Sequence, residues 1–392
     1  MSVSREPVRI LQFVGAMDYG GIETWLMQVL RRIDRTKFQL DFCYTGSKPG
    51  AYAPEIESLG GRMVACPLNR KDPIGFARRF RSLLRGAQYD IVHSHAHHFS
   101  GFVLRLARQE HVPVRMAHCH STSDGKGTGL SRGLYHALMR HWIWRHGTHG
   151  LAASEDAAQA LFGPNWRSDS RFRVLHCGID LEPFRQPVSR AAVRQELGIP
   201  LDAPVVGHVG SFRPAKNHPF LLEIAAEVVK HRPDVRFLLV GDGPLRPQIE
   251  ARARELGIAG NVIFTGVRSD VPRLMLGAMD LFLFPSLWEG LPIVVVEAQA
   301  AGLRCLVSDT VTREVSVVPG AVEFLPLSVG AGEWSSRALQ LLHYGRILSE
   351  VALGEVQRCG FNIERSADQL RTLYESALDH PVAETKRTPV PA

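Results

Sequence analysis

Short apolar segments typical of buried β-strands recur along this chain of 392 residues, and stretches long enough for a helix separate them. Regular alternation of strand and helix predicts parallel sheets with helices on both faces. A first series of strands is expected at 8–14, 38–44, 62–66, 91–95, 115–118, 150–153 and 173–175. A second is expected at 205–210, 236–240, 262–265, 281–284, 304–307 and 322–325. The predicted fold class is α/β, with two doubly wound, Rossmann-like domains.

The break between the two series sets the predicted domain boundaries. A proline-rich stretch at 183–204, which surrounds a short helix, is predicted to be a linker. It separates a first domain at 1–182 from a second at 205–362. A helix is expected at 363–380, and 381–392 is expected to be a loose tail. A chain of this length is sufficient for two domains, each with its own core.

Two carboxylates, Glu289 and Glu297, lie at a predicted strand-to-helix connection. The strand at 281–284 is followed by a proline, and Pro292 suits the first turn of a helix. Glu289 therefore belongs to the loop, whereas Glu297 lies inside an apolar helix, where an unpaired charge costs several kcal/mol. We expect Glu297 to accept hydrogen bonds from ligand hydroxyls or from a protein partner.

The start of the same helix is a predicted phosphate site. Backbone N–H groups around Gly290, Leu291 and Ile293 point out of the helix start, where anions bind well. A ligand whose hydroxyls bind one carboxylate and whose phosphate binds at a helix start has the chemistry of a sugar nucleotide. Spacing alone also allows a simpler alternative, in which Glu297 pairs with a core arginine and Glu289 is solvated.

Several motifs, in order along nearly the whole chain, resemble the family 4 retaining glycosyltransferases. The segment PSLWEGLPIVVVEAQAAGLRCLVSD at 285–309 looks like the region of that family in which two glutamates are separated by seven residues. Further similar segments are MDYGGIET at 17–24, CGIDLEPF at 177–184, KNH at 216–218 and VGDGP at 240–244. The chain is most similar to the bacterial capsular and exopolysaccharide branch.

The resemblance implies the GT-B arrangement, in which two Rossmann-like domains face a cleft and the last helix crosses back to the first domain. It implies transfer of a sugar, with retention, from a nucleotide-diphosphate sugar to a saccharide or polyprenyl-diphosphate-linked acceptor in cell-surface polysaccharide biosynthesis. The sugar nucleotide is a co-substrate, and no cofactor is implied. Alternatives on this scaffold are a sugar-nucleotide epimerase, a sugar phosphorylase and a sugar-nucleotide-binding protein with little turnover.

The resemblance also assigns roles to individual residues. Glu289 would meet the hydroxyls of the donor sugar and the developing positive charge, and Glu297 would bind the ribose hydroxyls. Gly20 and Gly21 would let the backbone approach the donor phosphates, although paired glycines equally mark any tight turn. Val267 follows a strand end that resembles the part of the family that holds the nucleobase.

The loop after the first strand of the second domain supplies positive charge. Arg213 and Lys216 can both reach a diphosphate and stabilise it as a leaving group. Lys216 matches its place in the family, but the family's phosphate arginine directly follows a glycine, where this chain has Ser211. We expect Arg213 to replace that arginine because its side chain is long. The alternative is a lower donor affinity and rate.

Histidines crowd two strand ends of the first domain. The family places one histidine near the reacting sugar, and His120 is the better match, with His118 second. A hydrogen-bonded strand-end histidine and a zinc site are the alternatives. No metalloprotease or Cys/His spacing supports zinc, and the resembling enzymes use no metal, so no metal is predicted. The histidines are His93, His95, His97 and His98 at one strand end and His118 and His120 at the other.

Basic residues are concentrated in the first part of the chain, where residues 1–185 hold 25 Lys and Arg against 16 Asp and Glu. No recognition-helix or RNA-stacking motif accompanies them, so no nucleic-acid partner is predicted. An anionic membrane surface or a lipid-diphosphate acceptor fits this charge. The segment from Arg132 to His146, with Trp142 and Trp144, is predicted to be a basic amphipathic helix of the kind that lies in a bilayer interface. Ordinary packing into the first domain is the alternative.

The chain has no run of about 18 apolar residues, and residues 1–7 contain no apolar stretch of signal-peptide length. We therefore expect a cytoplasmic protein, peripheral on the inner face of the cell membrane. The cysteines are scattered with no CxxC spacing, which predicts reduced thiols rather than disulfides or a zinc site. They are Cys43, Cys66, Cys119, Cys177, Cys305 and Cys359.

Overall fold

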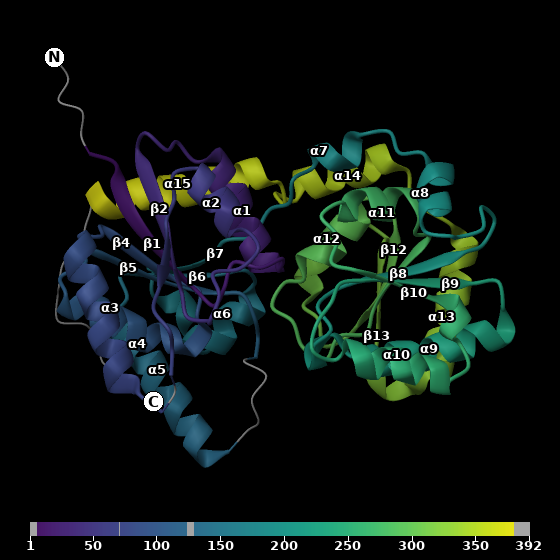
Figure 1. Cartoon of the computed structure of the whole chain (residues 1–392), viewed down its shortest axis with the longest axis horizontal. Helices are drawn as coiled ribbons and strands as arrows, with labels where there is room; N and C mark the ends of the chain where they lie inside the picture. The colour runs from purple at the N-terminus through teal and green to yellow at the C-terminus, as the bar shows by residue number, and fades with distance from the viewer. Residues whose placement is uncertain (1–5, 70, 124–128, 380–392) are drawn as a thin grey trace. The chain divides into compact units, whose positions relative to one another are not determined.

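The computed structural model describes residues 6–69, 71–123 and 129–379, and the chain divides into two compact units (Figure 1). Unit 1 comprises Met1–Gly178 and Ile363–Ala392, and unit 2 comprises Ile179–Asn362. Each unit contains one parallel sheet, so the predicted fold class is confirmed. Within the described ranges, no helix has the length and hydrophobicity that crossing a membrane requires.

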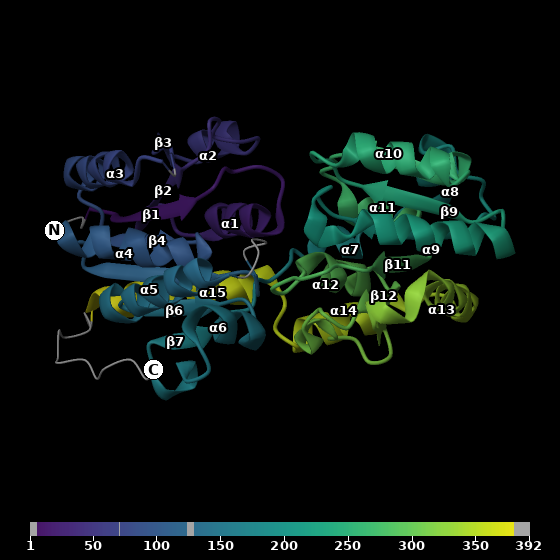
Figure 2. The ribbon, with the colours of Figure 1, turned by 90° about the horizontal axis from the view of Figure 1, so that it is seen from below.

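Unit 1 is built on a parallel sheet in the order β3-β2-β1-β4-β5-β6-β7, which Figure 2 shows from β3 at the top to β7 at the bottom. Figure 1 shows α1 and α15 along one face of this sheet and α3, α4, α5 and α6 along the other. The strands are β1 Val8–Val14, β2 Phe38–Tyr44, β3 Met63–Ala65, β4 Ile91–Ser94, β5 Val114–Cys119, β6 His149–Ala152 and β7 Phe172–Val174. The helices are α1 Gly21–Arg32, α2 Ala53–Ser58, α3 Pro73–Ala87, α4 Ser100–Gln109, α5 Leu130–His146, α6 Glu155–Phe162 and α15 Ile363–Asp379.

An aromatic cluster joins the sheet of unit 1 to α3. Phe13 of β1 meets the rings of Phe76 and Phe80 edge-on, with ring centroids 6.1 and 5.4 Å away. All three side chains are at most 1% exposed, and burying each one contributes about 1.5–3 kcal/mol. Helix α3 begins where it does because the side chain of Asp72 accepts a hydrogen bond from the N–H of Gly75.

The last helix, α15, packs in unit 1, as the resemblance implies. Its Tyr374 is fully buried. The indole N–H of Trp25 in α1 donates to the hydroxyl of Ser366 over 3.2 Å, and Arg32 pairs with Glu364 at 3.2 Å. A segment at the end of the chain therefore completes the core of the unit that contains the beginning.

Unit 2 is built on a parallel sheet in the order β10-β9-β8-β11-β12-β13. Figure 1 shows α9, α10 and α13 on one face and α11, α12 and α14 on the other. The strands are β8 Val205–Val209, β9 Arg236–Val240, β10 Val262–Gly266, β11 Leu281–Phe284, β12 Arg304–Ser308 and β13 Val322–Leu325. The helices are α7 Glu182–Arg185, α8 Arg190–Glu196, α9 His218–His231, α10 Arg246–Glu255, α11 Val271–Gly277, α12 Ile293–Ala300, α13 Gly330–Tyr344 and α14 Ser349–Arg358.

The strand order determines where ligands can bind. In a parallel sheet all carboxyl ends share one edge, and a crevice opens where the strand order reverses. The reversal lies between β1 and β4 in unit 1 and between β8 and β11 in unit 2. The loops that follow these four strands contain most of the site residues predicted from the sequence.

Helix α5 differs from the amphipathic helix that the sequence predicts. The ring of Trp142 stacks on Phe102 with centroids 5.9 Å apart, and the indole N–H of Trp144 donates to the carbonyl of Phe162 over 2.9 Å. Both tryptophans therefore pack within unit 1 and do not belong to an exposed apolar face. The exposed apolar residues of α5 are Leu130, Leu134 and Leu138, which are 92%, 73% and 45% exposed.

The segment predicted as a linker, 183–204, contains most of α7 and all of α8 and belongs to unit 2. Arg194 of α8 is only 2% exposed, and its guanidinium donates to the carbonyl of Ala203 over 2.7 Å and to that of Ala278 over 3.1 Å. It also pairs with Asp280 at 2.7 Å. A buried guanidinium thus holds α8 against the end of α11 and the start of β11.

Replacing this guanidinium should destabilise unit 2. We expect Arg194→Met to lower the free energy of opening around α8 and β11 by about 3–5 kcal/mol, because its carbonyl and carboxylate partners lose a buried charge. The matched control is Arg190→Met, whose side chain is 41% exposed and pairs with the same Asp280; it should cost about 1 kcal/mol or less. Hydrogen exchange, with peptides of unit 1 as the internal reference, measures both. Equal losses in the two variants would contradict the role of Arg194.

Candidate functional site

The loop after β8, residues 210–217, is held by close backbone contacts with the next strand connection. The N–H of Phe212 donates to the carbonyl of Asp242 over 2.9 Å. A Cβ at Gly241 would lie 2.1 Å from the carbonyl oxygen of Gly210, and one at Gly243 would lie 2.7 Å from that of Phe212. Only glycine fits at these two positions. The VGDGP segment therefore supports the loop that carries the predicted phosphate-binding residues.

Lys216 and Glu289 meet at the reversal of strand order in unit 2. The Nζ atom of Lys216 lies 2.6 Å from Oε1 of Glu289, and their side chains are 17% and 14% exposed. The same Nζ lies 4.7 Å from the ring centroid of Phe284. The N–H of Leu287 donates to the carbonyl of Ala215 over 2.7 Å, which ties the two loops together. A predicted phosphate-binding cation is thus paired with the predicted sugar-binding carboxylate.

Glu297 lies on α12, and its carboxylate has no hydrogen bond or ion pair with any described residue. Burial raises its pKa to about 7, because desolvation penalises the charged form. The alternative in which Glu297 pairs with a core arginine is therefore wrong for the described part of the chain. The carboxylate is left as an acceptor for a ligand.

The first turn of α12 offers backbone donors. The helix begins at Ile293 after Pro292, and in the described chain no side chain caps it. Leu291 is 6% exposed, and Gly290 is buried just before it. The positive end of the helix dipole at this position favours an anion.

Ser211 and Arg213 flank the fully buried Phe212 and are both exposed. The buried ring anchors the loop and leaves its two neighbours at the surface. The guanidinium of Arg213 has no hydrogen bond or ion pair to the residues that the structure describes. It is therefore available to bind a phosphate. This availability is what Arg213 needs if it replaces the family's arginine, which is absent at position 211.

Val267 follows β10, the edge strand of the sheet in unit 2, and is 51% exposed. Gly266 just before it has a φ of 71°, and its carbonyl accepts from the N–H of Gly241 over 2.9 Å. The backbone therefore turns sharply at Val267, two strands away from β8. Its predicted contact with a nucleobase stays a prediction.

Gly20 and Gly21 lie at the end of the loop after β1 and the start of α1. Neither has a positive φ, so the backbone conformation does not require glycine. A Cβ at Gly21 would meet no described atom within 4 Å, and one at Gly20 would meet only the side chain of Glu23. A turn is also present, since the N–H of Gly20 donates to the carbonyl of Asp18 over 3.0 Å, and the open space at Gly21 allows close approach of a ligand to the backbone.

His118 and His120 lie at the carboxyl end of β5, with ring centroids 3.9 Å apart. His118 is fully buried, and within the described chain neither of its ring nitrogens has a hydrogen-bond partner. His120 is half-buried, and its Nε2 lies 2.9 Å from Nδ1 of His95. Burial lowers the pKa of His120 to about 3, so the ring is neutral near pH 7.

The same cluster includes the atoms that a metal site would need. His118, His120 and Cys177 offer nitrogen and sulfur atoms within 4.8 Å of one another, as do the nitrogens of His93, His95 and His118. Both nitrogens of His95 are already hydrogen-bonded, to His120 and to Gln12, so a metal ion in the second group would have to displace one of these hydrogen bonds. In the first group, Nδ1 of His120 lies 3.7 Å from Sγ of Cys177 and makes no bond to His95. The absence of a metal stays a prediction.

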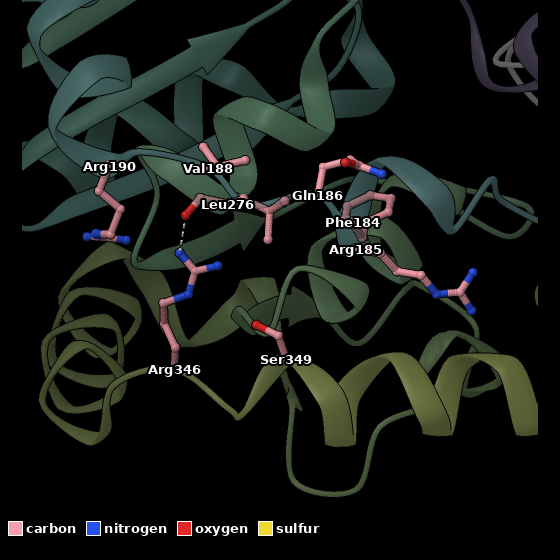
Figure 3. Close-up of a pocket in the computed structure, with 8 residues that line it drawn as sticks. All are labelled: Phe184, Arg185, Gln186, Val188, Arg190, Leu276, Arg346 and Ser349. Carbon is pink, nitrogen blue, oxygen red and sulfur yellow. Dashed lines mark hydrogen bonds between the residues drawn. The ribbon is translucent and has the colours of Figure 1, made fainter.

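A separate pocket of about 330 Å³ lies within unit 2 (Figure 3). Arg346 in its wall donates to the carbonyls of Leu276, Met279 and Ala301 at the ends of two helices. Burial lowers its pKa to about 10. Its charge thus stabilises helix ends, and the lining includes no predicted site residue. The pocket is lined by Phe184, Arg185, Gln186, Val188, Arg190, Leu276, Arg346 and Ser349.

Sequence reasoning missed the functional surroundings of His120. The sequence predicts a strand-end or zinc-ligating histidine at His95 and a reduced thiol in a family-like segment at Cys177, but it does not place either residue beside His120. The HxH spacing at the end of β4 mirrors that at the end of β5, and adjacent parallel strands bring the two ends together. That spacing was the available signal.

The raised pKa of Glu297 predicts a pH-dependent stability. Because the folded state holds this proton more tightly than the unfolded chain, the contribution is complete below pH 4.5 and is lost as the pH rises towards 7. Relative to Glu297→Gln, the wild type should lose on the order of 2 kcal/mol of unfolding free energy across this range. Urea unfolding at several pH values measures the difference. A difference that does not change with pH would show that Glu297 is not desolvated.

Comparisons with known proteins identify the families that the two parts of the chain match. Residues 19–183 match the family described as Glycosyltransferase Family 4, and residues 189–325 match Glycosyl transferases group 1. The chain is 35% identical over 370 residues to a putative glycosyltransferase, EpsF, of Bacillus subtilis (strain 168), covering 93% of this chain and 96% of EpsF.

Solved structures share the fold. HepE of Anabaena, in complex with UDP and glucose, superposes with a TM-score of 0.77 at 19% identity, over 94% of this chain and 100% of HepE. WaaG, a glycosyltransferase involved in lipopolysaccharide biosynthesis, superposes with a TM-score of 0.67 at 19% identity, over 95% of this chain and 100% of WaaG. Together with the extent of the likeness to EpsF, these matches show that the chain belongs to the family 4 glycosyltransferases and has the GT-B fold.

Proposed function

We propose that this glycosyltransferase moves a sugar, with retention of configuration, from a nucleotide-diphosphate sugar to a saccharide or polyprenyl-diphosphate-linked acceptor. The observation that carries the proposal is the meeting of Lys216 and Glu289 where the strand order of unit 2 reverses, in the connection that leads into α12 with the unpartnered carboxylate of Glu297. HepE has been solved with UDP and glucose, so uridine diphosphate sugars are the first donors to test.

The donor diphosphate is bound by Lys216, by Arg213 and by the N–H groups at the start of α12. These groups also stabilise the negative charge that develops when the diphosphate leaves. The phosphate takes the place of the Glu289 carboxylate at Nζ of Lys216. Glu289 is then released to accept hydrogen bonds from the sugar hydroxyls and to stabilise positive charge at the reacting carbon.

Glu297 accepts hydrogen bonds from the ribose hydroxyls in its ionised form. Those hydrogen bonds favour ionisation and therefore lower its raised pKa, so donor binding near pH 7 releases a proton. The leaving phosphate takes the proton of the acceptor hydroxyl on the same face of the sugar, and His120 positions the sugar. No metal enters this scheme, and we expect turnover to continue in the presence of a chelator.

The two carboxylates should respond differently to substitution. Glu297→Ala should weaken UDP binding by about 1.5–3 kcal/mol, the value for a charge-assisted hydrogen bond, and should abolish the proton release. Glu289→Gln should lower kcat far more than it weakens binding, because its interaction strengthens in the transition state. Calorimetry in buffers of different ionisation enthalpy, combined with UDP-release kinetics, measures both. Glu227→Ala, which removes a solvated partner of Lys230, is the control.

Unchanged UDP affinity in Glu297→Ala would contradict the ribose contact. Equal losses of binding and turnover in Glu289→Gln would contradict its transition-state role. Product formed without an acceptor would identify an epimerase, and dependence on free phosphate would identify a phosphorylase.

We also propose that the acceptor is presented at an anionic membrane surface on the cytoplasmic side, in cell-surface polysaccharide assembly. WaaG, which has the same fold, is involved in lipopolysaccharide biosynthesis. The exposed Leu130, Leu134 and Leu138 lie at helical spacing on α5, and Arg145 of the same helix is exposed. Exposed leucines beside basic residues fit the interface of an anionic bilayer.

Sedimentation with phosphatidylglycerol vesicles tests this surface. The wild type should sediment at low salt and be partly released as the salt concentration rises, because salt screens the charges. Leu134→Ser/Leu138→Ser should weaken the part of the binding that salt does not remove. Leu201→Ser, at an exposed leucine of unit 2, is the control. A wild type that ignores these vesicles at low salt would make a soluble acceptor the better proposal.

A further inference from the structure

A chain of buried and partly buried hydrogen bonds leads from the last helix of the protein to His120. The hydroxyl oxygen of Tyr374 in α15 lies 2.7 Å from Nδ1 of His93. The same hydroxyl accepts a hydrogen bond from the side-chain amide of Gln12 over 3.0 Å. The amide oxygen of Gln12 lies 2.9 Å from Nε2 of His95. Nδ1 of His95 lies 2.9 Å from Nε2 of His120. All five side chains belong to unit 1.

Every side chain in this series of hydrogen bonds is neutral near pH 7. Burial lowers the pKa of His93 and of His120 to about 3, and that of His95 well below its ordinary value. Burial also raises the pKa of Tyr374. Each imidazole therefore has one N–H and one unprotonated nitrogen. The direction of one hydrogen bond then determines the direction of the next.

The side-chain amide of Gln12 sets that direction. Because its oxygen faces His95, Nε2 of His95 must donate, and Nδ1 of His95 must accept. Nε2 of His120 therefore carries the hydrogen that Nδ1 of His95 accepts. The hydroxyl of Tyr374 accepts from the side-chain amide of Gln12, and it also lies 2.7 Å from Nδ1 of His93. Tyr374 thus holds the amide of Gln12 in the orientation on which the rest depends.

We propose that Tyr374, Gln12 and His95 are positioning residues, which hold His120 as the tautomer with its hydrogen on Nε2 and an unprotonated Nδ1. Nδ1 then accepts a hydrogen bond from a hydroxyl of the sugar. The assignment of the tautomer rests on the hydrogen bonds alone. Its use in transfer rests on the proposed function, in which His120 meets the sugar.

The present neighbour of Nδ1 of His120 can be replaced by a stronger hydrogen-bond donor. That neighbour is Sγ of Cys177 at 3.7 Å, and a thiol is a weak donor that a sugar hydroxyl can displace. Burial raises the pKa of Cys177, so this sulfur stays protonated and brings no negative charge. The ring of His118 packs against that of His120. The ring centroid of Trp25 lies 6.0 Å from that of His120. These contacts restrict rotation of the imidazole.

Ring-nitrogen NMR of protein with isotope-labelled histidine tests the tautomer without substrate. The signal of His120, assigned by its loss in His120→Gln, should show hydrogen on Nε2. Tyr374→Phe keeps the ring in place but frees the amide of Gln12, so it should convert His120 to a mixture of tautomers. The matched control is Tyr89→Phe, which removes another buried hydroxyl of unit 1, bonded to Asp41 over 2.9 Å. It should leave the tautomer of His120 unchanged.

Kinetics tests whether the tautomer is used. With UDP-glucose as the donor probe, Tyr374→Phe should lower kcat by about five- to tenfold, the equivalent of one hydrogen bond, and leave KM unchanged. His95→Leu should lower kcat at least as much. His95→Gln should recover part of it, because an amide can also accept from His120 and donate to Gln12. The control Tyr89→Phe should leave kcat unchanged.

The possible failures are distinct. A mixed tautomer, or hydrogen on Nδ1, in the wild type would overturn the proposal whatever the activity. The same tautomer in Tyr374→Phe as in the wild type would overturn the role of Tyr374. If the tautomers respond as expected but His120→Gln keeps full activity, the chain of hydrogen bonds stands and the proposed role of His120 in transfer fails.

Discussion

The placement of every candidate residue depends on one constraint, the parallel direction of all strands within each sheet. Each connection must return the chain to the edge where the strands begin, so all carboxyl ends lie together at the opposite edge, and helices cover both faces. Where the strand order reverses, neighbouring connections leave towards opposite faces and cannot fill the space between them. Residues distant in sequence, such as Lys216 and Glu289, meet at that edge because their connections follow the neighbouring strands β8 and β11.

Desolvation makes this edge chemically distinctive. A carboxylate in water ionises well below neutral pH, but Glu297 is held where ionisation is nearly balanced at pH 7. Glu289 instead has a cation beside it. The free energy of ionisation therefore differs between these two glutamates, which are eight residues apart. One has a protein partner, and the other has none among the described residues. That difference favours distinct tasks for the two side chains.

Local sequence pattern predicted what depends on a few neighbouring residues. The buried strands and the loop carrying Lys216 follow from apolar runs and their end signals, and the fold follows from their alternation. Periodicity could not place Trp142 and Trp144, because an inward tryptophan and a membrane-facing one have the same spacing. Nor could it show Arg194 bonded to carbonyls of a distant helix, or Tyr374 bonded to a strand some 360 residues earlier in the chain. Such contacts depend on tertiary packing, which no local window contains.

The position of α15 in unit 1 has a consequence for biosynthesis. Unit 2 lies entirely between the first segment of unit 1 and α15, so the ribosome must make nearly the whole chain before unit 1 can be completed. Until then, one face of the first sheet is covered by α1 without α15, and the nonpolar surface that α15 buries in the finished protein is accessible to water and to other nascent chains. Unit 2 has no such dependence, because its segment is continuous. The second half of this protein can therefore finish folding before the first.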